Sequence, residues 1–301
     1  MMKHTSVLLQ ECIDSLVIKP NGIYVDGTLG RAGHSSEILK NIPEGHLYCF
    51  DKDQQAIEES KGRLAAIRDN FTIIHSGFKN LKSELQQRGV EKIDGLLLDL
   101  GVSSPQFDEA SRGFSYRYDA PLDMRMDQSQ PLTAYEVVNT YEFNDLMRIF
   151  YRYGEDSYAK QVARKIEQAR SVKPIETTFE LVELIKSAYP SKVLNSKGHP
   201  AKKIFQAIRI EVNDELSELE TVLEDALEML AVGGRVAVIS FHSLEDRIVK
   251  ETFVRMSSQP KVDKRIPLMP NQIDEAPYRL ITKKPILAGE AELQANNRSH
   301  S

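Results

Sequence analysis

The chain has 301 residues, and its 39 Lys and Arg against 44 Asp and Glu give a formal net charge of −5. Charged residues at 28% and apolar residues at 41% are close to the averages of soluble globular proteins, which excludes a disordered or fibrous protein. The length fits two ordinary domains, or one large domain with an insertion. The acidic total argues against a protein that coats nucleic acid with its whole surface, but it leaves room for local basic patches.

Cysteine is rare, and no segment has the features of a targeting or membrane sequence. Cys12 and Cys49 are the only cysteines, and neither belongs to a Cys-x-x-Cys pair or to a Cys/His cluster with zinc spacing. This pattern argues against disulfides and a structural metal site, and it fits a reducing compartment. Gln10 and Glu11 interrupt the N-terminal apolar run too early for a signal peptide, and no run approaches the roughly 18 apolar residues of a membrane span. We therefore expect a soluble, cytoplasmic protein without a metal or a membrane partner.

The first hundred residues alternate between strand and helix signals. Short apolar runs predict strands over 23–26, 46–51, 71–75 and 93–100. Helical patterns separate them, one opening near residue 35 and one amphipathic over 56–67. Strands that are apolar throughout and alternate with helices indicate a parallel sheet covered on both faces. We predict an α/β fold with a doubly wound, Rossmann-like sheet.

The next similar strand, 234–241, comes more than a hundred residues later, so an insertion must precede it. The segment 105–131 is rich in Asp, Ser, Gly and Pro and predicts a long loop. Helices are predicted over 143–153, 157–170 and 178–188, followed by one long helical stretch from Pro200 to about Leu230. The second half of that stretch, 211–228, has eight acidic residues and no basic one, so we expect a crossover helix with its acidic face in water.

Basic charge is concentrated in the insertion. Residues 157–210 carry eleven Lys and Arg against four Glu, a balance of 11 − 4 = +7, and the remaining residues therefore carry −5 − 7 = −12. The pattern is compatible with an ordinary solvated helical surface. It is equally compatible with an anionic polymer partner, because the insertion follows the sheet edge at which such folds bind ligands.

A glycine-rich turn follows the first strand and precedes a helix: Asp26-Gly27-Thr28-Leu29-Gly30-Arg31-Ala32-Gly33-His34. Such a turn lets the backbone approach a ligand, although a plain tight turn would look the same. Asp51 ends the second strand 21 residues beyond Gly30, where an acidic side chain reaches a ribose diol. The spacing G-x-x-G-x-x-G differs from the G-x-G-x-x-G of NAD(P) sites. Together with the acidic Asp26, it favours S-adenosyl-L-methionine over a nicotinamide cofactor.

A second turn follows the fourth strand and reads Asp99-Leu100-Gly101-Val102-Ser103-Ser104-Pro105-Gln106-Phe107. Ser104 to Phe107 is loosely similar to the S-P-P-[YF] motif of enzymes that methylate exocyclic amines, although a simple Ser-Pro turn explains it as well. A side-chain oxygen and a backbone carbonyl that accept the two N–H bonds of the amine would localise its lone pair for attack on a methyl group. Methylation at C5 of a pyrimidine requires a cysteine nucleophile instead. No cysteine occurs after Cys49, which excludes that chemistry.

The end of the fifth strand carries a third candidate segment, Ser240 to Arg247, with His242 near its start. His242 could position the base or take up the proton that is released after methyl transfer. A histidine at a strand end more often caps the helix that follows or satisfies a neighbouring group.

These motifs together resemble the MraW family of bacterial ribosomal RNA small subunit methyltransferases, over nearly the whole chain and in order. The matching segments are 4–11, 26–31, 99–106, 112–115, 121–127, 199–201, 205–209 and 240–250. The resemblance implies methyl transfer from S-adenosyl-L-methionine to N4 of a cytidine in the decoding region of 16S rRNA, with the rRNA of the small ribosomal subunit as the partner. It implies no membrane partner and leaves a homodimer possible.

The resemblance also assigns residues and domains. Its cofactor contacts fall on Ala32, Gly33, His34, Asp51, Phe78, Asp99 and Gln106, and the candidate catalytic residues are Ser104, Pro105 and His242. The methyltransferase domain would comprise 1–104 and 211–301, and 105–210 would form the inserted loop and helical substrate-recognition domain. The loop 105–131 would belong to the substrate cleft and the basic helices to its RNA-facing wall.

The sequence departs from the family pattern at two places. Ala32 stands where the family has glycine, so we expect this residue to avoid positive φ. Tyr278 to Thr282 would supply one strand of a terminal hairpin, and its partner strand is missing from a chain that ends at Ser301, which we expect to be short of its natural end. This departure keeps open a second hypothesis, a non-catalytic RNA-binding ribosome assembly factor on the same fold.

Overall fold

The computed structural model describes residues 6–194, 198–259, 275–296 and 299; the side chains of Ser104, Pro105 and Val193 are outside this description. The chain divides into two compact units, one of 1–101 with 216–301 and one of 102–215. The sequence placed the two junctions at 104/105 and 210/211. In the part of the chain that the structure describes, no helix combines the length and apolarity that crossing a lipid bilayer requires.

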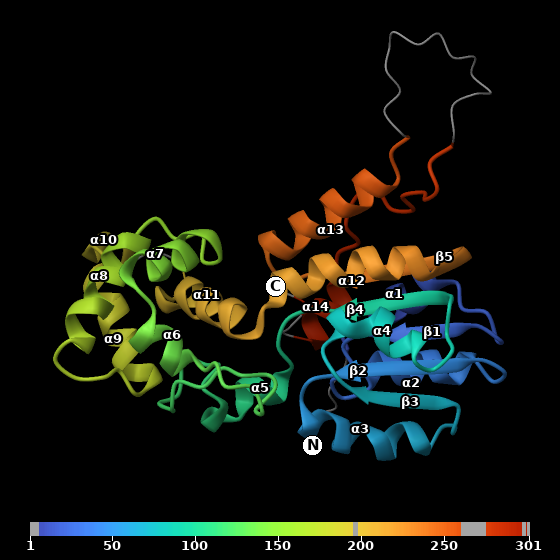
Figure 1. Ribbon diagram of the computed structural model, residues 1–301, viewed down its shortest axis with the longest axis horizontal. Coiled ribbons are helices and arrows are strands. Elements are labelled where there is room, and N and C mark those ends of the chain that lie inside the picture. The colour runs from blue at the N-terminus through green and yellow to red at the C-terminus, as the bar shows by residue number, and fades with distance from the viewer. Residues whose placement is uncertain (1–5, 195–197, 260–274, 297–298, 300–301) are drawn as a thin grey trace, which may run out of the picture. The chain divides into compact units, whose positions relative to one another are not determined.

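The first unit is built on a five-stranded sheet in the order β3-β2-β1-β4-β5, and every pair of neighbours is parallel (Figure 1). The strands are β1 (Ile23–Asp26), β2 (His46–Asp51), β3 (Phe71–His75), β4 (Ile93–Asp99) and β5 (Leu230–Ile239). This confirms the predicted α/β, doubly wound, Rossmann-like fold, with β5 beginning four residues earlier than expected. The order reverses direction between β1 and β4, and ligands of such sheets bind at that point, beyond the carboxyl ends of the strands.

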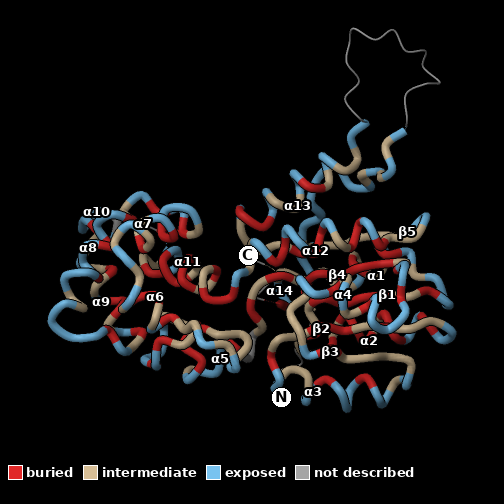
Figure 2. The backbone as a smooth tube through the Cα atoms, viewed as in Figure 1, coloured by how far each residue is buried: buried red, intermediate tan, exposed pale blue. Residues whose placement is uncertain are grey.

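Helices cover both faces of the sheet because successive strand residues point to opposite sides. On one face, α1 (Leu9–Leu16), α2 (Gly33–Asn41) and α3 (Gln54–Ala65) pack against a core that includes Leu47 and Cys49. On the other, α4 (Leu81–Gln86), α12 (Glu215–Met229) and α13 (Ser243–Met256) pack against Phe50 and Leu98. The central strands β1 and β4 are accordingly buried along most of their length, whereas the edge strands β3 and β5 have one buried residue each (Figure 2). Two further elements complete the unit, η1 (Phe78–Asn80) and α14 (Glu290–Ala295).

The second unit is helical and has its own apolar core. Its elements are α5 (Ser104–Asp108), η2 (Ala110–Arg112), α6 (Ala134–Thr140), α7 (Phe143–Arg152), α8 (Ala159–Arg170), α9 (Thr178–Ala188), α10 (Ser191–Leu194) and α11 (Ala201–Asn213) (Figure 1). Capping boxes begin α6, with Thr133 and Glu136, and α9, with Thr177 and Glu180. Each box satisfies backbone N–H groups that would otherwise lack partners in the first turn. The predicted helices over 143–153, 157–170 and 178–188 match α7, α8 and α9 within two residues.

Two predictions about the insertion are wrong. The expected loop 105–131 contains α5 and η2, whose few residues are too short to give a clear helical period. The long helix expected from Pro200 to Leu230 is interrupted at Asp214, where φ is 54°. Aspartate tolerates this left-handed conformation better than most residues. The helix therefore breaks between α11 and α12, although the helical pattern of the sequence continues across Asp214.

Two predictions about the first unit are also wrong. The acidic face of α12 is not wholly in water, because Glu218 is 2% exposed and its Oε1 lies 2.7 Å from Lys52 Nζ. The strand expected over 278–282 does not form, because the described residues supply no strand for it to pair with. Tyr278 instead donates its hydroxyl to the carbonyl of Leu227 in α12, at 2.7 Å. The residues at 297–298 and 300–301, at the end of the given sequence, lie outside the described residues.

Candidate functional site

The glycine-rich turn after β1 is held in place by strands on both sides. The amide of Gly27 donates to the carbonyl of Leu97 in β4, and the amide of Leu29 donates to Phe50 in β2, both at 2.9 Å. Thr28 Oγ1 accepts the amide of Asp99 at 2.7 Å. The turn is therefore fixed at the point where the order of the strands reverses.

A side chain would have little space at two positions of the turn. A Cβ on Gly27 would lie 2.4 Å from Leu98 Cδ2 and 3.3 Å from Phe78 Cβ. A Cβ on Gly33 would lie 1.9 Å from Ser6 Oγ. Close packing of this backbone brings Phe78, which follows β3, directly against the turn.

Ala32 contradicts the expectation drawn from the family pattern, because its φ is 57°. A left-handed alanine costs roughly 1–2 kcal/mol. Two contacts hold it there: its amide donates to Leu29 O at 2.7 Å, and its carbonyl accepts the amide of Ser36 at 3.0 Å. Ala32 is fully buried at the start of α2, so it shapes the turn through its backbone.

Asp51 turns its carboxylate towards the same turn. Oδ2 accepts the amide of Gly30 at 2.8 Å, and Oδ1 accepts the amide of Asp53 at 2.9 Å. Burial raises the pKa of Asp51 to about 6, although both N–H bonds act in the opposite direction. Each carboxylate oxygen retains lone pairs beyond these bonds, so Asp51 can still accept hydroxyl groups of a ligand.

Asp26 has a structural role in the turn. Its Oδ1 accepts the amide of Thr28 at 3.0 Å, and its Oδ2 accepts the hydroxyl of Ser35 at 2.6 Å. The residue is 1% exposed. Its carboxylate therefore stabilises the backbone conformation of the turn from inside the protein.

His34 and Asp99 lie together on the other side of the turn. The ring of His34 is buried, with Nε2 3.0 Å from the carbonyl of Val7 and Nδ1 3.8 Å from Asp99 Oδ2. These contacts orient the ring and place a carboxylate at the end of β4, one strand away from β1. The structure thus brings Gly33, His34, Asp51, Phe78 and Asp99 around one turn in the first unit.

Sequence reasoning missed a buried charge cluster beside Asp51. Glu218 of α12 lies 2.7 Å from Lys52 and 3.3 Å from Lys79, measured from Oε1 to each Nζ. Gly77 leaves room for this cluster, because a Cβ on residue 77 would lie 2.7 Å from Lys52 Cε. These lysines follow Asp51 and Phe78 directly in the sequence, so the cluster fixes the backbone next to both predicted contacts. A buried glutamate on an otherwise acidic helix gives no sequence signal.

Three predicted residues belong to the second unit. Ser104 and Pro105 begin α5, and Gln106 in the same helix is buried and accepts the amide of Ser103 at 2.9 Å. Contact of Ser104 and Pro105 with the substrate amine, and of Gln106 with the cofactor, stays a prediction.

His242 caps α13. Its Nδ1 accepts the amide of Glu245 at 3.4 Å, and Glu245 Oε2 in return accepts the amides of Phe241 at 2.8 Å and His242 at 3.3 Å. The other ring nitrogen, Nε2, lies 3.1 Å from Glu245 Oε1. Both nitrogens therefore face one glutamate, which gives the ring a capping role that the sequence left open. The catalytic role of His242 stays a prediction.

The two thiols are poorly suited to nucleophilic chemistry. Cys49 is fully buried in β2, and burial raises its pKa well above the ordinary value. Burial likewise raises the pKa of Cys12 to about 12. A thiol attacks as the thiolate, so neither cysteine supplies a nucleophile near neutral pH.

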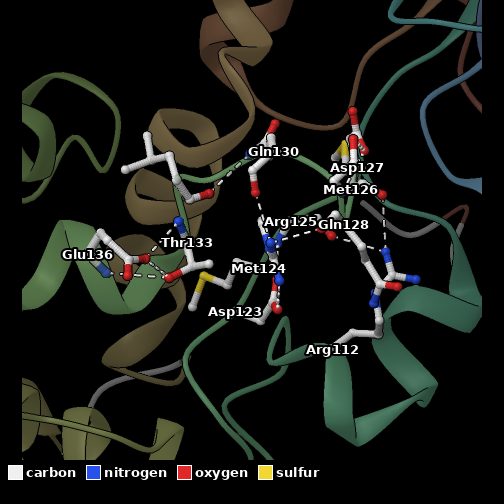
Figure 3. A network of polar contacts seen from close by, with 12 residues as sticks. Arg112, Asp123, Met124, Arg125, Met126, Asp127, Gln128, Gln130, Thr133 and Glu136 are labelled. Carbon is white, nitrogen blue, oxygen red and sulfur yellow. Dashed lines mark hydrogen bonds and ion pairs between the residues drawn. The ribbon is translucent and has the colours of Figure 1, made fainter.

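The segment that follows α5 and η2 is fixed by polar contacts centred on Arg125 (Figure 3). Its guanidinium binds Asp123 through two bonds, Nε to Oδ1 at 2.9 Å and Nη2 to Oδ2 at 2.8 Å. Nη1 donates to the carbonyls of Gln128 at 2.9 Å and Gln130 at 2.8 Å. Arg112 Nη2 donates to the carbonyl of Arg125 at 3.0 Å.

Asn213 at the end of α11 secures the same segment. Its Oδ1 accepts the amide of Met126 and its Nδ2 donates to the carbonyl of Met124, both at 2.8 Å. Met124 has φ of 60°, a conformation that these contacts stabilise. The segment predicted to form part of a substrate cleft is therefore held by contacts within the second unit.

The chain is similar to known proteins over almost its whole length. Two curated relatives, both called ribosomal RNA small subunit methyltransferase H, come from Streptococcus dysgalactiae subsp. equisimilis and Streptococcus pyogenes serotype M4. Each is 58% identical over 99% of this chain and 95% of its own length. A crystal structure of an rRNA methylase from Streptococcus thermophilus covers 35% of this chain and 58% of its own, with 22% identity and a TM-score of 0.27. The model of the MraW methylase family matches residues 1–301. The chain therefore belongs to the MraW methylase family.

Proposed function

We propose that this protein transfers a methyl group from S-adenosyl-L-methionine to N4 of a cytidine in the decoding region of 16S rRNA. The observation that carries the proposal is the pair of carboxylates, Asp51 and Asp99, on the strands either side of the glycine-rich turn after β1. Relatives that are 58% identical over almost the whole chain are named as methyltransferases of small-subunit rRNA. The cytoplasm, where that RNA is found, is the proposed place of action.

The turn has the donors and acceptors that the cofactor needs. Asp51 would accept the ribose hydroxyls, Phe78 would stack on the adenine, and Ala32, Gly33 and His34 would line the turn. Asp99 would accept the amino group of the methionine portion, and Gln106 would add an amide contact. When bound, the cofactor supplies a methyl group activated by its sulfonium sulfur. The protein's part is to hold this methyl group and the target nitrogen in line.

The target amine requires help because its lone pair is delocalised into the cytosine ring. Two acceptors on its N–H bonds, the Ser104 side chain and the Pro105 backbone carbonyl, would localise that pair on nitrogen. The buried, protonated thiols of Cys12 and Cys49 argue against the competing reaction at C5. The cytosine-N4 assignment rests on these arguments together.

The second unit would hold the RNA. The range 157–210 carries a charge balance of 11 − 4 = +7, and Lys160, Lys165, Lys192 and Lys202 are exposed. Phosphate contacts by such side chains supply affinity without sequence preference. A cytosine within folded RNA would have to turn out of its stack to reach the cofactor.

Methyl transfer can be measured directly. We expect purified protein to transfer tritium from methyl-labelled S-adenosyl-L-methionine to small-subunit RNA from cells that lack this methylation. Asp99→Asn should lose the transfer, whereas Asp69→Asn, which changes an exposed carboxylate beyond α3, should keep it. RNA binding without cofactor binding or transfer would instead support the alternative, a non-catalytic assembly factor.

A further inference from the structure

An exposed surface of the second unit combines aromatic rings with basic side chains. Three segments far apart in the sequence meet there: 115–119, the start of α9 and the start of α11. The carbonyl of Tyr118 accepts the hydroxyl of Thr178 at 2.7 Å, and Asp119 Oδ1 accepts the amide of Phe179 at 3.2 Å. Pro121 and Thr177 form an antiparallel bridge beside these bonds. The segment 115–119 is therefore anchored to α9.

The same segment is anchored to α11 through stacked rings. Tyr116 lies over His199, with ring centroids 4.3 Å apart and an interplanar angle of 10°. Tyr116 also meets Phe205 edge-on at 5.8 Å. His199 Nδ1 accepts the amide of Ala201 at 3.2 Å, which orients the ring. The base of this surface is thus a fixed aromatic layer.

The outer part of the surface is exposed. Tyr118 is 52% exposed and Phe179 is 44% exposed, although large aromatic side chains are usually buried. Arg117, between the two tyrosines, and Lys202, three residues beyond His199, are also exposed. Such exposed rings contribute nothing to the core and are available to a partner.

Basic side chains accompany the exposed rings. Burial and the cations of Lys186 and Arg117 lower the pKa of His199, whose ring stacks on Tyr116. The carboxylates nearby make contacts of their own: Glu183 pairs with Lys186 at 2.8 Å, and Asp119 accepts the amide of Phe179. Glu176 and Glu180, beside the start of α9, both pair with Lys173. Arg117 and Lys202 are exposed basic residues of this surface.

We propose that this aromatic–basic surface, made of Tyr116, Arg117, Tyr118, Phe179, Lys186, His199 and Lys202, binds a single-stranded segment of the RNA substrate. Exposed rings stack on unpaired bases, and the basic groups contact the phosphates between them. A duplex hides the faces of its bases, so it could contact only the basic side chains of this surface. The inference rests on the proposed function, because it presumes that the substrate is RNA.

The test compares this surface with a matched pair of residues elsewhere on the same unit. Tyr151 and Arg152 in α7 are likewise an exposed tyrosine and arginine that are adjacent in sequence, and Tyr151 is 69% exposed. The probe is a fluorescein-labelled, unstructured RNA of about ten nucleotides, measured by anisotropy over a range of salt concentrations. A blunt-ended RNA duplex of the same length serves as the duplex probe.

We expect Tyr118→Ala to weaken binding of the single-stranded probe about tenfold at every salt concentration, the loss of one stacked base. Arg117→Gln should reduce the slope of log affinity against log salt by about 0.7, the loss of one phosphate contact. Tyr151→Ala and Arg152→Gln should change neither value. All four variants should bind S-adenosyl-L-methionine as the unaltered protein does.

Two results would overturn the inference. The first is tight binding of the single-stranded probe that Tyr118→Ala and Arg117→Gln leave unchanged. The second is an equal effect of Tyr118→Ala on the blunt-ended duplex, which would show that stacking on unpaired bases is not involved. Both results leave the proposed function standing if methyl transfer is intact. Absence of RNA binding and of methyl transfer in the unaltered protein would refute the proposed function itself.

Discussion

The role of Asp51 can be tested most sharply, because its carboxylate both holds the glycine-rich turn and is proposed to bind the cofactor. Burial raises its pKa from the ordinary 3.8 to about 6. The shift of about 2 units corresponds to at most about 3 kcal/mol between its two protonation states. The pKa of Asp51 is higher in the folded than in the unfolded protein. The contribution of Asp51 to the stability of the cofactor-free protein is therefore fully present below about pH 4. It is lost as the pH rises towards 6.

The affinity for the cofactor should depend on pH in the opposite sense and increase as the pH rises. Ribose hydroxyls donate best to the ionised carboxylate, so affinity should be constant well above pH 6. Below pH 6 it should fall by up to tenfold per pH unit, because the carboxyl must first lose its proton. Asp51→Asn should weaken binding by about 1.5–3 kcal/mol at pH 8, the value of hydrogen bonds to a charged group. The variant should also lose the pH dependence.

Calorimetric titration with S-adenosyl-L-methionine between pH 5 and pH 8 measures both effects. Asp53→Asn is the matched control, because Asp53 is two residues away, caps α3 by accepting the amide of Gln55, and can be replaced by asparagine as a cap. It should retain the affinity at pH 8, and its affinity should still fall at low pH, although at a lower pH, because the Asp53 charge contributes to the raised pKa of Asp51. An affinity in the unaltered protein that stays flat down to pH 5, or that Asp51→Asn leaves unchanged, would refute the role of Asp51.

Substitutions at three further residues test other parts of the account. His242→Asn, which preserves a helix cap, should lower kcat about 100-fold or more while cofactor affinity stays normal, the loss of a proton-transfer group, whereas His242→Ala should in addition lower the free energy of unfolding by about 1 kcal/mol; an unchanged kcat in the asparagine variant would leave His242 with its capping role alone. Gly27→Ala should cost about 1–3 kcal/mol of stability, measured by urea unfolding, because its Cβ would lie 2.4 Å from Leu98 Cδ2; an unchanged midpoint would contradict the steric argument. Arg125→Lys should destabilise the protein by about 2 kcal/mol in the same assay, because lysine cannot form the paired bonds to Asp123, and a neutral result would show that the network in Figure 3 contributes little.

The sheet could be predicted from the sequence because its strands are marked by local composition. Apolar runs such as Phe71 to His75, separated by amphipathic helices, specify buried parallel strands without any long-range information. Asp51 and Asp99 were found for the same reason, since a polar residue that ends an apolar strand reaches the carboxyl edge of the sheet. The family resemblance alone supplied Phe78.

What the sequence did not reveal depends on contacts between distant segments. Asp214 breaks a continuous helical pattern by adopting positive φ, and Ala32 adopts the conformation that was expected of glycine. Glu218 belongs to an acidic helix but is buried between two lysines that follow other strands. His242 could be a base or a cap in the sequence, and the contacts with Glu245 identify it as a cap. Such features depend on tertiary packing, which a local pattern does not encode.

The central claim is tested most directly by identifying the methylated nucleoside. Small-subunit RNA from cells that lack this protein would be treated with the purified protein and S-adenosyl-L-methionine, digested, and analysed by mass spectrometry against nucleoside standards. The account predicts a single new product, N4-methylated cytidine, mapped to the decoding region of 16S rRNA. A methyl group on C5 of cytidine, on another base, or on no nucleoside at all would contradict it.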